Sequence, residues 1–383
     1  MAVGHVFSNA VRTLPAMASD VLGRDLLVTA DQLAAITSAF PAAFALAMVP
    51  VGVALDRWGV RRTSLTLFCI AVVGAVLAAL APSARGMLLA QIVLGVGCSG
   101  MLMCPMTFAA RTMPVARFAL WSGIIQAVGN TGMLLSASPL ALLIEAEGWR
   151  AGFAAAGVLG LVGMLLVALT VRLPAPVRQG PPGSLWADAG QVLRLAASPA
   201  LRGVMLMAFA SFAVVLGLRG LWGGPWLMEV KGLSRVEAGN VLLAATVTLC
   251  FAPALAGVVD RWLGNRRWLL AGSHLATAAL IVGLLAGRGL PVWWDTLMLV
   301  LFGCIISFQV LLFPLTRSLV PAEQTGRALS AQNIFFFGGA AVMQGVSGVV
   351  ASYGGVSAAL SCFAVALVVC SLGFLWLMRP ARA

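Results

Sequence analysis

A short basic stretch, GVALDRWGVRR at residues 52–62, decides how this chain is interpreted. A second version, GVVDRWLGNRR, stands at residues 257–267. Each copy lies between two long uncharged runs, so each is expected to form a tight basic loop that joins two membrane helices. A loop duplicated in this way predicts two homologous halves, and paired bundles of membrane helices commonly enclose a solute pathway.

The composition is that of an integral membrane protein. Of the 383 residues, 61% are hydrophobic and 9% are charged. A soluble fold could not cover its surface with so few polar groups. About 20 helical residues cross a bilayer core, and uncharged runs of at least that length recur along the chain. These runs are residues 32–55, 63–84, 86–110, 118–144, 151–171, 238–259, 268–287, 296–316 and 328–378, the last of which is expected to break at the turn-forming residues 352–355.

Two further apolar segments, residues 3–21 and 203–228, each contain one arginine, and including them gives twelve spans. We therefore predict an all-α integral membrane protein with twelve transmembrane helices in two pseudo-symmetric six-helix bundles around a central cavity. The N-terminal half is expected to cover residues 1–172 and the C-terminal half residues 201–383. Residues 173–200 are expected to form a cytoplasmic linker that contains an amphipathic helix near residues 186–195.

The distribution of arginines predicts the orientation in the membrane. Alternate loops carry most of the arginines, and the opposite loops hold most of the aspartates and glutamates. Under the positive-inside rule, this pattern predicts a cytoplasmic (inner) membrane protein with both termini in the cytoplasm. The net charge of +12 then follows from topology. Nucleic-acid binding is not expected, because the arginines are scattered over many loops.

No motif indicates bond-making chemistry. The seven cysteines lie within predicted spans and have no metal-binding or redox spacing. His5 and His274 are isolated in the sequence. We therefore expect no catalytic residues, no metal and no cofactor, and we do not interpret the chain as an enzyme. The expected partners are a small-molecule substrate and the lipid bilayer, with the protein acting as a monomer.

The loop at residues 52–62 resembles the signature G-x-x-x-D-R-x-G-x-R-R of the major facilitator superfamily of secondary transporters, and the resemblance covers essentially the whole chain. It implies a loop that holds one access state and releases it during switching. Asp56 could also cap a neighbouring helix or pair with arginines, whereas the loop arginines could simply anchor to anionic lipid. The switch residues that the resemblance implies are Gly52, Asp56, Arg57, Gly59, Arg61, Arg62, Asp260, Arg261, Arg266 and Arg267.

Two positions depart from family patterns: the first argues against the proton-relay role attached to the family's span-4 arginine, and the second argues against a multidrug efflux pump. Gln91 stands where the span-4 pattern R-x-x-x-G-x-G has its arginine. The Gly-Pro pair that marks many drug/proton antiporters in span 5 is also missing, and Gly129-Asn130-Thr131-Gly132 stands in its place.

The prediction of the substrate depends on Arg12 and Arg219. A charge at mid-membrane costs at least a few kcal/mol, so it is expected to face a cavity or a partner. Both arginines lie in the first helix of their half, which repeat symmetry would place on opposite walls of one cavity. Paired guanidiniums favour an anion, and this arrangement resembles the organophosphate and organic anion exchanger group. Alternatively, one arginine could extend to the interface or pair structurally with Asp20 or Glu229.

Other polar side chains on the predicted spans could assist the arginines. Residues 219–226 are also rich in glycine and proline, which predicts a discontinuity in span 7. A single amide in an apolar helix could equally serve as a hydrogen bond between helices. The candidate substrate-binding residues, besides the two arginines, are Asn9, Gln126, Asn130, Trp222, Gln309 and Asn333.

These observations predict a secondary active transporter that moves a small anionic metabolite, such as an organic anion or a phosphate ester, by alternating access. Antiport by anion exchange is favoured, because no carboxylate stands at mid-membrane to carry a proton. One alternative is a transporter or exporter of a neutral or hydrophobic compound, in which the arginines are structural. The other is a transporter-like sensor that binds an anionic ligand without net flux.

Overall fold

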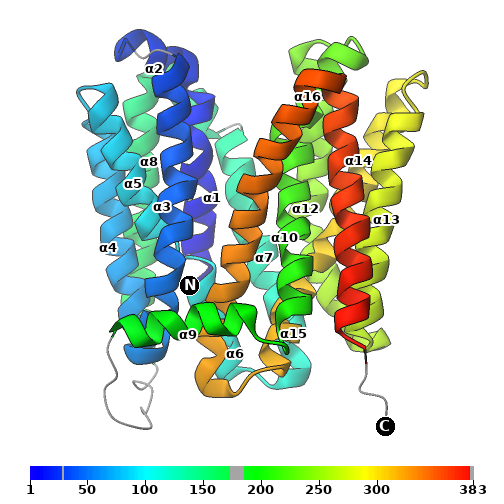
Figure 1. The fold of residues 1–383 in the computed structure, drawn as a ribbon. Coiled ribbons are helices and arrows are strands. Elements are labelled where there is room, and N and C mark those ends of the chain that lie inside the picture. The colour runs from blue at the N-terminus through cyan, green and yellow to red at the C-terminus, as the bar shows by residue number, and fades with distance from the viewer. Residues whose placement is uncertain (28–29, 138, 173–184, 380–383) are drawn as a thin grey trace. The chain divides into compact units, whose positions relative to one another are not determined.

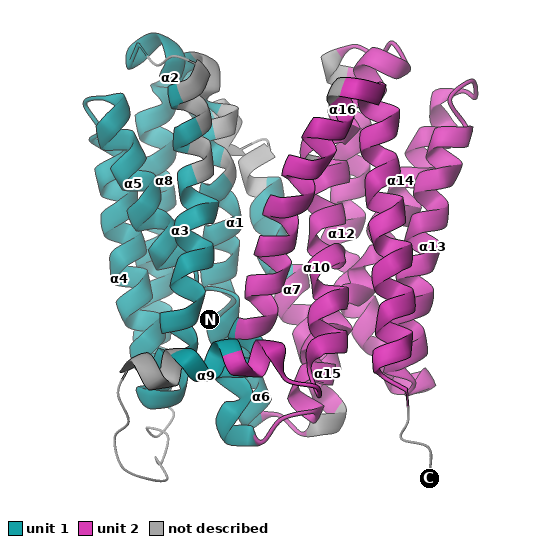
Figure 2. Cartoon of the chain, in the orientation of Figure 1, with its two compact units in different colours: residues 1–112, 128–193, 322–330 teal, residues 113–127, 194–321, 331–383 magenta. Residues whose placement is uncertain are grey.

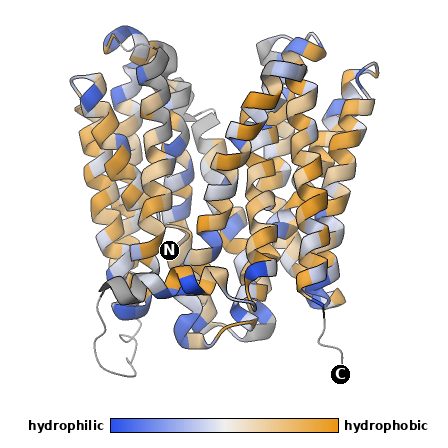
Figure 3. Cartoon of the chain, viewed as in Figure 1, coloured by the Kyte–Doolittle hydropathy of each residue, from blue (hydrophilic) through white to orange (hydrophobic). Residues whose placement is uncertain are grey.

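The computed structural model describes residues 1–27, 30–137, 139–172 and 185–379, and these are almost entirely helical (Figure 1). Ten helical segments among them are long and apolar enough to cross a bilayer. With α1 (Ala2–Met17) and α7 (Val115–Ala137), they make the twelve membrane helices that the sequence predicts. Hydrophobic residues cover most of the helix lengths, while hydrophilic residues collect mainly toward the helix ends (Figure 3).

The remaining helices follow the predicted spans closely. Those of the first half of the chain are α2 (Ser19–Asp25), α3 (Ala30–Arg57), α4 (Gly59–Ala79), α5 (Ala84–Cys98), α6 (Met103–Thr112) and α8 (Pro139–Thr170). Then follow α9 (Leu185–Ala197), α10 (Arg202–Val215), η1 (Leu216–Trp222), α11 (Gly223–Pro225), η2 (Trp226–Val230), α12 (Arg235–Leu263), α13 (Arg266–Ala286), α14 (Val292–Ile306), η3 (Ser307–Leu311), α15 (Leu312–Ser318), η4 (Ala322–Gln324) and α16 (Thr325–Leu377).

The chain forms two compact units (Figure 2). The first contains residues 1–112, 128–193 and 322–330, and the second contains residues 113–127, 194–321 and 331–383. Three helices are therefore divided: the beginning of α7 and the end of α9 belong to the second unit, and the beginning of α16 belongs to the first. The predicted boundaries at residues 172 and 201 stay a prediction. Residues 173–184 of the predicted linker lie outside the described residues, and α9 covers the helix expected near residues 186–195.

Glycines with positive φ make the turns that the sequence requires. Gly59 (φ 79°) and Gly264 (φ 64°) stand in the two copies of the basic loop, where they reverse the chain between consecutive helices. Gly355 (φ 68°) breaks the long helix α16. This break lies within the predicted turn at residues 352–355, so that prediction is confirmed. A residue with a Cβ adopts this left-handed backbone conformation only at a cost, which explains why glycine stands at each turn.

A glycine in each basic stretch also allows two helices to approach closely. In the first unit, a Cβ on Gly52 would lie 2.7 Å from Ser330 Oγ, at the beginning of α16. In the second unit, a Cβ on Gly257 would lie 2.7 Å from the carbonyl oxygen of Ala119, at the beginning of α7. Small residues at such crossings let helix backbones pack in the membrane without a side chain between them.

We expect that replacing Gly52 or Gly257 by leucine lowers both thermal stability and transport. The added side chain overpacks a helix crossing, which costs about 1–3 kcal/mol. The melting temperature of the purified protein and substrate flux in proteoliposomes would measure the two effects. Gly239→Leu on α12 is the matched control, because a Cβ there meets nothing within 4 Å. Unchanged stability and flux in Gly52→Leu would show that neither depends on the close crossing of α3 and α16 at Gly52.

Candidate functional site

Asp56 ends α3 as a buried carboxylate with several partners inside the first unit. Its Oδ1 accepts a hydrogen bond of 3.0 Å from a terminal guanidinium nitrogen of Arg111 on α6. Its Oδ2 accepts the backbone N–H of Arg327 at 3.2 Å and lies 3.5 Å from the Nε of the same residue. Because Arg327 belongs to the first turn of α16, the carboxylate meets the positive end of that helix. Asp56 thus both caps a helix and pairs with two arginines.

Arg327, one of the two arginine partners of Asp56, extends this cluster to a fourth helix. Arg327 donates from its Nη1 to Gln191 Oε1 of α9 at 2.6 Å, so α9 is fixed to the beginning of α16 within the first unit. We call Asp56, Arg111 and Arg327 the switch cluster. Neither arginine was among the predicted switch residues. Arg111 and Arg327 stand in basic loops of the sequence, but nothing local marks them as partners of Asp56.

The second copy of the basic loop makes a different set of contacts. Asp260 is buried and accepts a bidentate pair from Arg266 of the same loop, at 3.0 Å to Nε and 2.9 Å to Nη2. In each copy one arginine holds the loop to the backbone of a later helix in its own unit. Arg61 donates to the carbonyl of Ala168 at 3.0 Å, and Arg267 to that of Leu375 at 2.8 Å. The exposed side chains in the two loops include Arg62 and Arg261.

Arg12 is half-buried in α1 and is held by a neighbour on the same helix. It donates to Asn9 Oδ1 at 3.0 Å. The amide nitrogen of Asn9 in turn donates to the carbonyl of Gly129 on α7 at 2.9 Å and lies 3.4 Å from His5 Nε2. Asn9 is 2% exposed. It therefore orients the guanidinium while anchored to a second helix, and the structure joins these two candidate substrate residues by a hydrogen bond.

Arg219 lies just after α10, where the α-helix continues as a π-helix. It belongs to the π-helical turn η1, which is followed by the three residues of α11 and by a second π-helical turn, η2. The predicted discontinuity is thus present as a widened helix rather than a break. Such π-turns are common at functional sites, because they displace side chains from the regular helical positions.

The hydrogen-bond partner of Arg219 is neutral. Its Nε donates to Thr246 Oγ1 of α12 at 2.7 Å. Within the described part of the chain, no carboxylate forms an ion pair with Arg219, and Glu229 is exposed. The alternative that Glu229 neutralises this arginine is therefore not what the structure shows. The positive charge is retained in a half-buried position.

The other candidate residues lie on the helices where the sequence predicted them. Trp222 of η1 donates from Nε1 to the buried Ser347 Oγ at 2.9 Å, within the second unit. Gln309 lies in the 3₁₀ turn η3, and its buried Oε1 has no hydrogen-bond partner among the described residues. An acceptor buried in this way is costly unless water or a ligand donates to it. The remaining amides are Gln126 and Asn130 on α7 and Asn333 on α16.

The second unit contains a buried charged cluster that the sequence did not predict. Lys231 Nζ lies 2.8 Å from Asp295 Oδ2 and also donates to the carbonyls of Gly287 and Leu290. Trp226 donates to Asp295 Oδ1 at 2.8 Å. The Lys231 and Asp295 side chains are 4% and 0% exposed. Hydrogen bonds to Asp295 Oδ1 and from Lys231 to the two carbonyls offset part of the desolvation cost of this buried ion pair, while Asp295 Oδ2 faces the Lys231 ammonium without a hydrogen bond among the described residues.

Together these features define an integral membrane protein built from two helical units that carry duplicated basic loops. A model of the Major Facilitator Superfamily matches residues 1–344, and the chain belongs to this family. The match confirms the resemblance inferred from residues 52–62 and places the chain in a family of transporters rather than among enzymes. Within the described residues, no group of three or more histidine, cysteine, aspartate or glutamate side chains could hold a metal ion.

Individual relatives are named for different transported compounds. The "Tetracenomycin C resistance and export protein" of Streptomyces glaucescens is 25% identical over 341 residues, covering 73% of this chain and 61% of that protein. The "Probable sulfoacetate transporter SauU" of Cupriavidus necator is 26% identical over 262 residues, covering 65% of this chain and 59% of that protein. The chain thus spans about three fifths of the length of these relatives.

A solved structure of the proton:xylose symporter XylE shares the fold. It has a TM-score of 0.77 at 16% sequence identity, over 99% of this chain and 94% of that one. At this identity, the likeness establishes the architecture and not the substrate.

Proposed function

We propose that the protein is a secondary active transporter of a small anionic metabolite and that it works by alternating access. The observation that supports an anionic substrate is the position of Arg219 on a widened membrane helix. Its guanidinium is half-buried, and its hydrogen-bond partner is the neutral Thr246. A guanidinium in such a place binds a carboxylate, sulfonate or phosphate through charge-assisted, bidentate hydrogen bonds. Arg12, in the first helix of the other half, is proposed to contact the same anion, with Asn9 holding it in position.

The remaining candidates are proposed to shape the site around the anion. Gln309 offers an acceptor for a substrate hydroxyl or amine, because its buried carbonyl oxygen has no partner among the described residues. Trp222 would supply an apolar wall. The amides Gln126, Asn130 and Asn333 are proposed as further polar contacts. The relative named for sulfoacetate, a small dianion, supports this substrate class.

We propose that the switch cluster holds one access state and that transport requires its release. In support, Asp56 ties α3 to α6 and to the first turn of α16 through charged hydrogen bonds. Exchange of one anion for another is the proposed mode of coupling. We also propose a monomer in the cytoplasmic membrane with both termini in the cytoplasm, halves at residues 1–172 and 201–383, and a linker at residues 173–200. The arginine-rich alternate loops support this orientation.

A second candidate is export of a neutral or hydrophobic compound. The relative named for tetracenomycin C resistance and export favours it, since its identity to this chain is similar to that of the sulfoacetate relative. In that case Arg12 and Arg219 would serve as structural hydrogen-bond donors to Asn9 and Thr246.

Thermal stability of the purified protein against a ligand panel tests the proposal. The panel contains phosphate, sugar phosphates, sulfonates, carboxylates, neutral sugars and lipophilic compounds. A ligand at a hundred times its Kd stabilises the protein that binds it by about 2.7 kcal/mol. We expect only anions to raise the melting temperature, and the best of them to exchange across proteoliposome membranes. Stabilisation by lipophilic compounds alone would favour the exporter, and binding without flux would indicate a sensor.

A further inference from the structure

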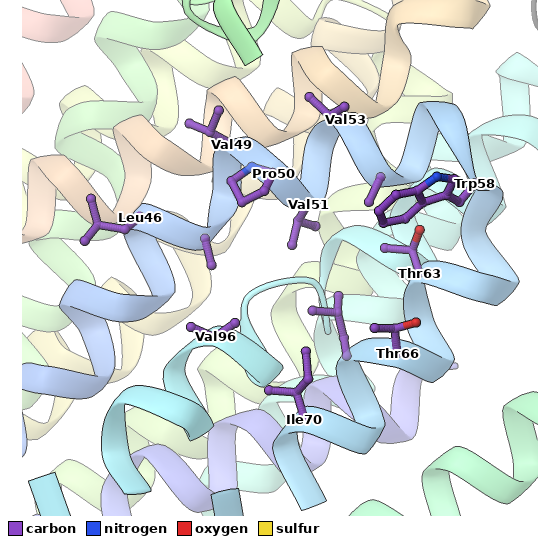
Figure 4. A pocket seen from close by; sticks show the side chains of 13 residues that line it. Leu46, Val49, Pro50, Val51, Val53, Trp58, Thr63, Thr66, Ile70 and Val96 are labelled. Carbon is purple, nitrogen blue, oxygen red and sulfur yellow. The ribbon is translucent and has the colours of Figure 1, made fainter. Parts of the chain in front are cut away.

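An apolar groove runs along the first unit between α3, α4 and α5 (Figure 4). Its volume is about 650 Å³. Val53 and Pro50 from α3, Ile70 from α4 and Val96 from α5 contribute to its wall. No charged side chain lines it among the described residues. The groove is therefore unlike the arginine sites described above, and an apolar chain would fit it better than a polar solute.

The length of the groove matches one leaflet of a bilayer. It follows α3 from Leu46 to the turn at Trp58, which at 1.5 Å per helical residue is about 18 Å. One leaflet contributes about half of the roughly 30 Å hydrocarbon core. Leu46 is 78% exposed and Trp58 51% exposed, so the groove is open along its side rather than closed off in the protein interior.

One end of the groove is polar and basic. Trp58 lies there, and tryptophan is typical of the boundary between lipid chains and headgroups. Thr63 lines the same end, and its Oγ1 is buried without a hydrogen-bond partner among the described residues. Arg61 and Arg62 precede Thr63 on α4 and are both exposed, and Arg61 also donates from one terminal nitrogen to the carbonyl of Ala168 on α8. This end thus combines a buried hydroxyl that lacks a partner with two cationic side chains.

We propose that the groove binds one acyl chain of an anionic phospholipid, whose phosphate is held at Arg61 and Arg62. The unpartnered Thr63 hydroxyl would hydrogen-bond to the ester or phosphate oxygens of the lipid. Basic residues at the membrane surface attract anionic headgroups, and the apolar groove adds a place for the chain directly beneath them. A bound lipid would lie along α3, the helix that carries Asp56, and would therefore be placed to influence the switch cluster.

Fluorescence quenching by lipids with brominated chains tests this site. The protein is reconstituted in phosphatidylcholine vesicles that contain either dibromo-phosphatidylglycerol or dibromo-phosphatidylcholine at the same mole fraction. The contribution of Trp58 is the difference between the parent and Trp58→Phe. We expect phosphatidylglycerol to be preferred by about 30-fold, the order expected of two arginines that each contribute about 1 kcal/mol near an anionic headgroup. Equal quenching by both lipids would overturn the proposal, because it would indicate contact with bulk lipid only.

Two pairs of variants test headgroup binding and acyl-chain binding separately. Arg61→Ala/Arg62→Ala should abolish the preference for phosphatidylglycerol, whereas Arg261→Ala in the second loop copy should retain it. Ala47→Phe, which fills the groove, should lower quenching of Trp58, whereas Val73→Phe on the exposed face of α4 should not. If Ala47→Phe does not fold, Ile70→Phe on the opposite wall serves the same purpose. A preference that persists without both arginines, or quenching unaffected by filling, would overturn the proposal.

Discussion

Replacing Asp56 by alanine should reduce transport by about two to three orders of magnitude. The buried carboxylate neutralises Arg111 and Arg327 and accepts an N–H in the first turn of α16. Removing one partner of a buried ion pair costs about 3–5 kcal/mol, because the other charge is left uncompensated. That energy would be lost from the state seen here, so the balance between access states would shift strongly. Initial rates of substrate exchange in proteoliposomes would measure the effect.

The second loop copy provides the matched control for Asp56. Asp260→Ala removes an equally buried carboxylate, but its bidentate partner Arg266 belongs to the same loop. We therefore expect a smaller loss of flux in Asp260→Ala than in Asp56→Ala. Asp56→Asn keeps an oxygen for the backbone N–H of Arg327 but loses the charge, so its rate should lie between those of the parent and Asp56→Ala. Equal rates in Asp56→Ala and the parent would contradict the switch cluster.

The fold could be predicted from the sequence because its signals are local. Long uncharged runs give the membrane helices, and charged or glycine-rich stretches give the turns between them. The glycines at positions 59 and 264 adopt positive φ where the two basic loops reverse. The turn predicted at residues 352–355 contains Gly355, where α16 breaks. Each of these features depends on residues that are adjacent in the chain.

The partners of the charged residues could not be predicted in the same way. Asp56 lies 55 residues from Arg111 and 271 from Arg327, and hydropathy contains no information about such pairs. Lys231, the residue after η2, and Asp295 of α14 likewise meet only when these helices pack together. The sequence identifies these residues as charged groups near helix ends. Which of them become buried partners depends on the packing of the helices.

The candidate substrate residues fall between these two cases. Asn9 and Arg12 are three residues apart on one helix, so their hydrogen bond follows from helical periodicity. The contact between Arg219 and Thr246 joins two helices and was not predicted. The glycine- and proline-rich run after Arg219 did indicate an irregular helix, although not that π-helical turns would form it. Local chemistry therefore located the arginines, and packing determined their neighbours.

Replacing Arg219 by alanine should reduce anion affinity by at least about 30-fold. Truncating one partner of a buried charge pair costs about 2–5 kcal/mol of binding free energy, because the charge of the substrate is left without a counter-charge. Arg12→Ala should have an effect of the same order if both arginines contact the anion. Arg219→Lys should recover part of the affinity, because an ammonium keeps the charge but cannot form the bidentate contact. Affinities are measured from ligand-dependent melting temperatures and from the concentration dependence of exchange.

A structural role of Arg219 would give a different result, and Thr246 distinguishes the two. Thr246→Val removes the neutral hydrogen-bond partner of Arg219 but leaves the guanidinium in place. If Arg219 binds the anion, Thr246→Val should weaken binding far less than Arg219→Ala does. If the bond between helices is the function of Arg219, both variants should lose similar stability without ligand and retain the same affinity. The second outcome would contradict an anionic substrate. Export of a neutral compound would then be the better proposal, because the guanidinium of Arg219 would bind no ligand.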